Sequence, residues 1–259
     1  MAPESRRARR ARRAAPTRGR APGLGVERSL QEPDGRLVGG MDEVGRGALA
    51  GPVTAGLVVL RPGTERGVAG LRDSKLLSPA RREALVPRIL AWCAAVGIGH
   101  ASPQEIDGLG LTAALRLAGR RAIAAAAQHG GAPPEVVLLD GGHDWLSLPQ
   151  DAFPAGAAGP DPASGPDWAG TVVTRVRADL TCASVAAASV LAKVERDRIM
   201  GELSDGWPQY GWDGNKGYGA ARHRRALQEH GTTPHHRLSW RLTQAPPTAG
   251  PGTIGEGTT

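Results

Sequence analysis

Four acidic residues fall at or just after the ends of predicted strands: Asp42, Glu43, Asp140 and Asp179. In α/β proteins the strand ends are where ligands bind. Carboxylates that gather there repel one another, and each is costly to bury without a partner. A divalent cation removes both costs, and oxygen ligands without a Cys or His cluster favour Mg²⁺ or Mn²⁺ over Zn²⁺. Two such ions about 4 Å apart could activate a water and stabilise the leaving oxygen of a phosphodiester.

The same acids have an ordinary alternative, as solvated turn residues at the surface. Asp42 and Glu43 also raise a geometric objection, because adjacent residues on a regular strand face opposite sides of the sheet. They can share a site only where the strand bends. The flanking glycines, Gly39, Gly40 and Gly45, would permit such a bend.

The elements that must position these acids follow from apolar periodicity and from cap and turn signals. Strands are predicted over residues 37–41, 53–60, 94–100, 135–139 and 171–176. Helices are predicted over residues 78–92, from Ser102 through a single stripe that includes Leu111 and Ala122, over 183–203 and over 220–229. Ser102 and Glu105 have capping-box spacing, and Pro87 is expected to kink or split the first helix. This order is typical of an α/β domain in which helices cover one sheet.

Six short motifs occur along the chain in a fixed order. They are Gly40-Met41-Asp42-Glu43-Val44-Gly45-Arg46-Gly47, Asp73-Ser74-Lys75, Leu139-Asp140-Gly141, Ala178-Asp179 with the segment 184–194, Asn215-Lys216-Gly217-Tyr218-Gly219, and Thr233-Pro234-His235-His236-Arg237. With these motifs, which span about 42–237, the sequence resembles the ribonuclease HII family. The resemblance implies a ribonuclease H-like fold, in which helices flank a central mixed sheet and a helical extension follows at the C-terminus.

The resemblance also implies an activity. It is hydrolysis of the RNA strand in RNA–DNA hybrids and incision on the 5′ side of a ribonucleotide embedded in duplex DNA, leaving 3′-hydroxyl and 5′-phosphate ends. By motif match the metal-binding and catalytic carboxylates are Asp42, Glu43, Asp140 and Asp179, which would hold two Mg²⁺ or Mn²⁺ ions. The partners implied are hybrid and ribonucleotide-containing duplexes.

Further residues are assigned to the substrate by the same match. Gly45-Arg46-Gly47 corresponds to the element that senses the ribose 2′-hydroxyl, and glycines do let a backbone approach a sugar closely. Tyr218 corresponds to the tyrosine that packs on the sugar after the junction. The alternatives are an ordinary glycine turn and a core tyrosine.

The lysines are the weaker candidates. The chain has only three, Lys75, Lys193 and Lys216, and all lie inside the motifs, as does Ser74. They could contact phosphates or support the carboxylates, or they could be solvated surface residues. The basic cluster at 222–225 could hold a duplex or simply face solvent. His235 and His236, without a cysteine nearby, do not indicate a metal site.

The sequence departs from the family pattern around the fourth acid. Ala178 stands where the family usually has glycine, and the lysine that usually follows is absent from the run Leu180-Thr181-Cys182. The resemblance therefore leaves the local geometry beside Asp179 open.

Charge and composition set the domain boundaries. Residues 1–20 contain eight arginines and one acid, so they account for the whole formal net charge of +7. We predict a disordered Arg-rich tail over 1–35, one catalytic domain over 36–243 with an irregular insertion at about 147–169, and a second disordered tail over 244–259. No apolar run is long enough to span a membrane, and two cysteines make no disulfide framework, so a cytoplasmic monomer is expected.

Two other functions stay open at this point. The chain could be a catalytically weak nucleic-acid-binding protein whose Arg-rich tail supplies the affinity. It could also be a different metal-dependent phosphohydrolase on the same fold, such as a structure-specific DNA nuclease. Cleavage of duplexes with one ribonucleotide, of hybrids and of all-DNA duplexes would distinguish the three.

Overall fold

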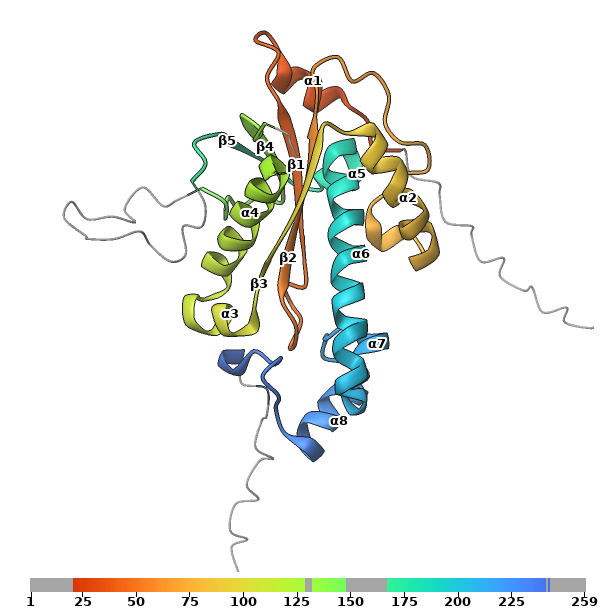
Figure 1. Cartoon of the computed structure of the whole chain (residues 1–259), viewed down its shortest axis with the longest axis vertical. Coiled ribbons are helices and arrows are strands. Elements are labelled where there is room, and N and C mark those ends of the chain that lie inside the picture. The colour runs from red at the N-terminus through yellow and green to blue at the C-terminus, as the bar shows by residue number, and fades with distance from the viewer. Residues whose placement is uncertain (1–20, 129–131, 148–166, 241, 243–259) are drawn as a thin grey trace, which may run out of the picture.

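A five-stranded mixed sheet forms the centre of the molecule (Figure 1). The computed structural model describes residues 21–128, 132–147, 167–240 and 242. Its strands are β1 (Val38–Val44), β2 (Val53–Leu60), β3 (Ala95–Ala101), β4 (Val136–Asp140) and β5 (Thr171–Arg175), in the spatial order β3-β2-β1-β4-β5. β1 pairs antiparallel with β2 and β2 with β3, whereas β4 pairs parallel with both β1 and β5. All five predicted strands are confirmed.

Helices cover both faces of this sheet (Figure 1). They are α1 (Gly25–Gln31), α2 (Pro79–Trp92), α3 (Pro103–Leu109), α4 (Leu111–Gln128), α5 (Ala178–Thr181), α6 (Ala183–Gly206), α7 (Trp212–Asn215) and α8 (Ala221–His230), with 3-10 turns η1 (Ser74–Leu76), η2 (Pro208–Tyr210) and η3 (Leu238–Trp240). α3 and α4 pack on one face, and α6 packs on the other with α2 outside it. α7 and α8 close a small core against the end of α6 and form the predicted helical extension.

Two glycines explain how closely the helices approach the sheet. A Cβ at Gly97 of β3 would lie 1.8 Å from the carbonyl oxygen of Ala122 in α4. A Cβ at Gly40 of β1 would lie 2.3 Å from the Ser184 hydroxyl and 2.4 Å from the backbone of α6. The alanine-rich helices therefore pack directly against strand backbone at these points. For β1, this contact brings the start of α6 to the strand that carries Asp42.

The helix predicted from Ser102 onward is in fact two helices. The capping box forms as expected, with the Ser102 hydroxyl accepting from the backbone N–H of Glu105 at 3.1 Å and the Glu105 carboxylate accepting from the Ser102 N–H at 2.8 Å. The break comes at Gly110, whose φ of +78° is accessible to glycine and ends α3. Pro87 does not split the first predicted helix, so that part of the expectation is wrong. The helix α2 continues through Pro87 without interruption.

The prediction that residues 1–35 form a disordered tail is wrong for the part nearest the domain. Residues 25–31 form α1, and Leu24 is buried beside it. Glu27, only 1% exposed, accepts hydrogen bonds from the backbone N–H and the hydroxyl of Ser184 at 2.9 and 2.8 Å. The signal was missed because the apolar face of this helix is short, with Val26 and Leu30 packed on the core and the buried acid Glu27 between them.

The other predicted irregular segments lie almost wholly outside the described residues, which exclude 1–20, 148–166 and 243–259. Just after the insertion, the Trp168 indole donates to the carbonyl of Pro134 at 2.7 Å. None of the helices in the described part of the chain combines the length and hydropathy of a membrane span.

Candidate active site

Asp42 and Asp140 are placed side by side by two parallel strands, β1 and β4. Met41 of β1 is in register with Leu139 of β4, so Asp42 and Asp140 are the next residues along neighbouring strands. Asp42 is 5% exposed, and its Oδ1 accepts from the backbone N–H of Glu43 at 2.9 Å. The bend that Asp42 and Glu43 would need in order to face one site is absent from the pairing, because β1 stays in regular register with β2 through Val44. Both acids nevertheless experience the charge of Asp140.

Asp179 arrives from the other side, on the short helix α5. The chain enters this helix through Arg177, which has the left-handed φ of 58°. The backbone N–H groups of Ala178 and Asp179 then donate to Asp140 Oδ1 at 2.7 and 3.4 Å. Ala178 is helical, so the glycine usual in the family is not needed at that position. The backbone strain lies one residue earlier instead.

The electrostatics of the cluster favour neutralisation. Burial raises the pKa of Asp42 to about 8, and the nearby charges of Glu43 and Asp140 add to the effect. Burial also raises the pKa of Glu43, against the opposing influence of Arg46. The pKa of Asp179 is raised by burial and by repulsion from Asp140. Carboxylates perturbed in this way are characteristic of functional sites.

Lys75 is the lysine that lies beside the acidic cluster. It sits on η1, where its backbone N–H donates to the Asp73 carboxylate at 2.9 Å, and its Nζ lies 3.6 Å from Asp179 Oδ2. Burial lowers the pKa of Lys75, but the surrounding carboxylates outweigh burial and raise it above its ordinary value. The side chain is 73% exposed, so it can also meet a substrate phosphate.

The donor set fits a hard divalent cation, because it consists of carboxylate oxygens. Burial, together with repulsion from Asp140, raises the pKa of Asp42, Glu43 and Asp179, and a bound cation would offset that cost. The side chains are not drawn together around one point: among the described residues, no group of three or more His, Cys, Asp or Glu is arranged to hold a metal ion. Two of the acids instead face protein cations, with Arg46 3.6 Å from Glu43 and Lys75 beside Asp179.

A chain of hydroxyls supports Asp42 from behind. The Ser189 hydroxyl on α6 lowers the pKa of Asp42 against the effect of burial, and it lies 2.7 Å from the Ser74 hydroxyl on η1. Ser74 is only 4% exposed. It therefore contacts the scaffold of the carboxylate site rather than open solvent.

The loop Gly45-Arg46-Gly47 is held by Arg237. This guanidinium is fully buried and donates to the carbonyls of Gly45 at 2.7 Å, Arg46 at 2.9 Å and Gly51 at 3.1 Å. Because one rigid guanidinium donates hydrogen bonds to three carbonyls, it fixes the path of the loop. A Cβ built at Gly47 would meet nothing within 4 Å, so the outer side of the loop is open.

Tyr218 is tied to the same loop by a second buried arginine. Its ring, 39% exposed, lies 5.6 Å from the guanidinium carbon of Arg196. Arg196 donates to the carbonyls of Pro52 and Lys216, both at 2.9 Å, and of Ala50 at 3.1 Å. Tyr218 and the loop after β1 are thus parts of one connected unit.

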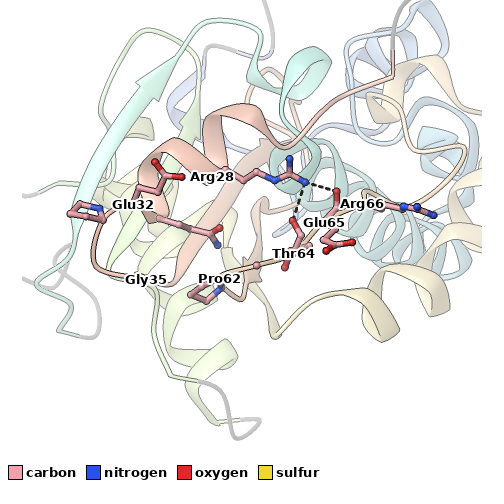
Figure 2. Close-up of a pocket in the computed structure, with 10 residues that line it drawn as sticks. Arg28, Glu32, Gly35, Pro62, Thr64, Glu65 and Arg66 are labelled. Atoms are coloured by element: carbon pink, nitrogen blue, oxygen red, sulfur yellow. Dashed lines mark hydrogen bonds between the residues drawn. The ribbon is translucent and has the colours of Figure 1, made fainter.

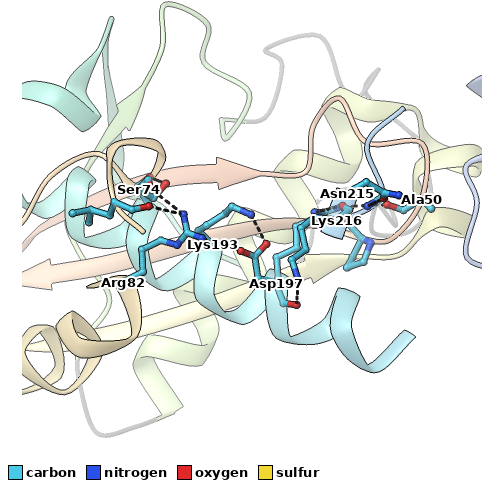
Figure 3. A network of polar contacts seen from close by, with 12 residues as sticks. Ala50, Ser74, Arg82, Lys193, Asp197, Asn215 and Lys216 are labelled. Carbon is cyan, nitrogen blue, oxygen red and sulfur yellow. Dashed lines mark hydrogen bonds and ion pairs between the residues drawn. The ribbon is translucent and has the colours of Figure 1, made fainter. Parts of the chain in front are cut away.

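Lys193 and Lys216 do not join the carboxylates. Lys193 pairs with Asp197 one helical turn along α6, and Lys216 Nζ donates to the Asp197 carbonyl at 3.4 Å (Figure 3). Arg82 also contacts the Asp197 carboxylate, at 3.3 Å, and donates to the Ser74 carbonyl at 3.0 Å. These residues form a structural network along α6, whereas Lys75 alone of the three lysines reaches the acidic cluster.

Sequence reasoning gave no role to three residues that organise the site: Ser189, Arg196 and Arg237. Arg196 lies in the charged half of a long helix, where an arginine is expected to face solvent, yet it is fully buried. Its only signal was its spacing from Met200, which places both on the same helical face. Arg237 closes the last motif, but nothing in its neighbours shows that its donors meet a loop near residue 45.

A pocket elsewhere on the surface is separate from this site (Figure 2). It lies between α1 and the loop after β2, where Arg28 donates to the carbonyls of Thr64 and Glu65. None of the four carboxylates lines it.

Comparison with known proteins identifies the family. The family model of ribonuclease HII matches residues 39–243. The chain belongs to the ribonuclease HII family. It is 47% identical to the ribonuclease HII of Streptomyces griseus over 228 residues, covering 86% of this chain and 85% of that protein. It is 43% identical to the ribonuclease HII of Paracoccus denitrificans, covering 85% and 91%.

The ribonuclease H-like fold is confirmed as well. The crystal structure of ribonuclease H2 from Pyrococcus horikoshii OT3 matches with a TM-score of 0.58 at 23% identity, over 80% of this chain and 94% of that one. The crystal structure of Bst-RNase HIII in complex with Mn²⁺ matches with a TM-score of 0.57 at 18% identity, over 83% of this chain and 70% of that one. The chain is accordingly an enzyme of the ribonuclease H type. The ribonuclease HII match begins after α1, so α1 lies outside the family model.

Proposed function

We propose that the enzyme hydrolyses the RNA strand of RNA–DNA hybrids and incises duplex DNA on the 5′ side of an embedded ribonucleotide, leaving 3′-hydroxyl and 5′-phosphate ends. The observation that carries the proposal is that Asp42, Glu43, Asp140 and Asp179 lie on neighbouring elements, β1, β4 and α5, and are close enough for Asp140 to raise the pKa of the other three. Membership of the ribonuclease HII family supports the substrate class.

The four carboxylates would hold two divalent ions, Mg²⁺ or Mn²⁺. Such ions, when bound, supply an activated water and stabilise the leaving oxygen of the phosphodiester. Asp42 and Asp140 are the fixed part of the set, because the strands and the N–H groups of α5 hold them in place. Glu43 and Asp179, now facing Arg46 and Lys75, are the side chains that would turn inward.

Recognition of the ribose is assigned to the loop Gly45-Arg46-Gly47 and to Tyr218. The open space outside Gly47 lets backbone groups approach a 2′-hydroxyl, the group that distinguishes RNA from DNA at one nucleotide. The exposed ring of Tyr218 would pack on the next sugar. Because Arg196 and Arg237 tie both elements together, the two contacts are made in a fixed relative position.

The remaining substrate candidates have different roles in the proposal. Lys75 would contact the phosphate backbone while balancing the carboxylates. The network of Figure 3 supports η1 and the loop of residues 215–219, called here the Tyr218 loop. Through this network Lys193, Lys216 and Ser74 would act on the substrate indirectly. We also propose a monomer in a reducing cytoplasm. The reducing compartment is supported by Cys93 and Cys182, which are buried and form no disulfide.

The test is a nicking assay on three end-labelled duplexes of one sequence: all DNA, DNA with one ribonucleotide, and an RNA–DNA hybrid. We expect Mg²⁺-dependent cleavage of the second and third substrates only, and loss of cleavage in Asp42→Asn. Binding without nicking would identify a nucleic-acid-binding protein instead. Cleavage of the all-DNA duplex would point to a DNA nuclease.

A further inference from the structure

Two histidines form a buried pair beneath the Tyr218 loop. His223 on α8 is fully buried and His236 is 1% exposed, and their Nε2 atoms lie 3.1 Å apart. Tyr210 and Trp212 pack around them, with the Tyr210 ring 4.9 Å from His236. The pair plays no part in the carboxylate site. The Nε2 atoms of the two histidines point at each other, so they do not converge on a common point where a metal could sit.

Fixed donors and acceptors assign every ring nitrogen of the pair. The indole N–H of Trp212 can only donate, so His223 Nε2, at 3.2 Å, is an acceptor and Nδ1 carries the proton. That proton is donated to the carbonyl of Tyr218 at 2.9 Å. The backbone N–H of Thr233 donates to His236 Nδ1 at 2.9 Å, so the proton of His236 is on Nε2 and points at His223.

The result is a directed relay of neutral imidazoles. It runs from the Thr233 N–H through His236 and His223 to the carbonyl oxygen of Tyr218. An added proton would set two donors against each other at either ring. Burial lowers the pKa of both histidines, consistent with the neutral form. The titratable side chains around the pair are Tyr210 and His235, and among the described residues no carboxylate forms an ion pair with either histidine.

We propose that His223 and His236 are positioning residues that fix the backbone of Tyr218, and thereby the direction of the ring that meets the substrate sugar. This inference rests on the role of Tyr218 proposed above. Neither histidine touches substrate in the proposal. Their action on cleavage passes entirely through Tyr218.

The Tyr218 loop needs such a restraint because of its backbone. Lys216 and Gly217 have φ values of 52° and 83°, an unusual pair that leads directly into Tyr218. On the ring side the contact is the stacked guanidinium of Arg196. On the carbonyl side the acceptor is shared by His223 and the N–H of Ala220, at 2.9 and 2.8 Å. The relay therefore fixes the carbonyl group of Tyr218, and with it the backbone to which the Tyr218 ring is attached.

Two substitutions of His223 separate positioning from stability. Asparagine places its amide where Nδ1 lies, so His223→Asn can still donate to Tyr218 but leaves the donors of Trp212 and His236 without an acceptor. Glutamine places its amide where Nε2 lies, so His223→Gln keeps that acceptor and loses the donor to Tyr218. We expect His223→Asn to have the lower Tm, yet His223→Gln to have the lower kcat/KM on a duplex with one ribonucleotide, by about tenfold for the lost hydrogen bond. The same order for Tm and for activity would overturn the proposal.

A double-mutant cycle gives an independent test that does not need His223→Asn to fold. In a Tyr218→Ala background, His223→Gln should cause no further loss of kcat/KM, because the ring that it positions is gone. Additive losses would show a general structural role and overturn the proposal. His230→Gln, on the same helix and exposed, is the matched control and should behave as wild type. If Tyr218→Ala itself cleaves normally, the role of Tyr218 is wrong and the inference falls with it. If only His223→Gln is silent, the relay alone is refuted.

Discussion

Replacing Asp42 by asparagine should stabilise the folded enzyme when divalent ions are absent. Asp42 has a pKa of about 8 in the folded protein against 3.8 in the unfolded chain, mainly because of burial. Between these values the folded state holds more protons than the unfolded state, so stability falls as the pH rises from about 4 to about 8. An asparagine side chain cannot ionise, so the Asp42→Asn variant avoids this loss. Its side-chain oxygen can still accept from the Glu43 N–H, so the local hydrogen bond survives.

The size of the effect follows from the same interval. Each pH unit in which one proton separates the two states is worth about 1.4 kcal/mol, so the ceiling is about 6 kcal/mol. Relaxation of the site around the charge reduces this figure, and we expect Asp42→Asn to exceed wild type by roughly 2–4 kcal/mol at pH 8. At pH 4 the two proteins should be nearly equal, because Asp42 is then neutral in the folded state.

The assay is urea unfolding in EDTA at pH 4 and pH 8. Asp34→Asn, an exposed acid 70% accessible to solvent, is the matched control and should show no pH-dependent gain. Adding Mg²⁺ at pH 8 should stabilise wild type and leave Asp42→Asn almost unchanged, so that the difference between the two proteins narrows. The reasoning would be refuted if the free energy of unfolding of wild type did not fall below that of Asp42→Asn between pH 4 and pH 8.

Three further perturbations test other parts of the molecule. Residues 1–20 carry the whole net charge, and deleting them leaves α1 intact. The deletion should reduce the log–log salt slope of duplex binding by roughly 6 while sparing cleavage at low salt. An unchanged slope would show that the arginines do not contact the duplex. Arg237→Leu leaves buried carbonyls without a donor and should cost roughly 3 kcal/mol in urea unfolding, whereas a loss within about 0.5 kcal/mol would contradict its bracing role. Gly40→Ala should cost about 2 kcal/mol or more by forcing β1 from α6, while Gly47→Ala, which meets open space, should unfold like wild type.

Much of this architecture was predictable because local signals agree with the fold. The strand over 53–60 was predicted to the residue, since a buried apolar run bounded by Pro52 and by the charged Arg61 leaves little choice. The four carboxylates were predicted as a group because strand ends collect ligands and because their motifs match one family.

What the sequence did not predict depends on long-range contacts of single polar residues. Helix α1 is held by the bonds from Ser184 to Glu27 and by the core contacts of Val26 and Leu30, and one apolar pair a single turn apart is too short a pattern to predict a helix. Arg196 and Arg237 are typical surface residues by type, yet both are buried against backbone carbonyls. Their partners in and after the β1 loop lie 144 and 192 positions away along the chain, so only the folded chain reveals them.

These long-range contacts also set an order of events during synthesis. The strand that carries Asp42 leaves the ribosome early, but the loop that follows it waits for a residue 192 positions later, because Arg237 supplies the donors that hold Gly45. Helix α1 likewise waits for the N–H of Ser184, 157 positions downstream of Glu27. Domains form in step with the emerging chain only as far as their contacts are local. A chain that stopped short of residue 237 would carry all four carboxylates and still lack the brace of its substrate loop.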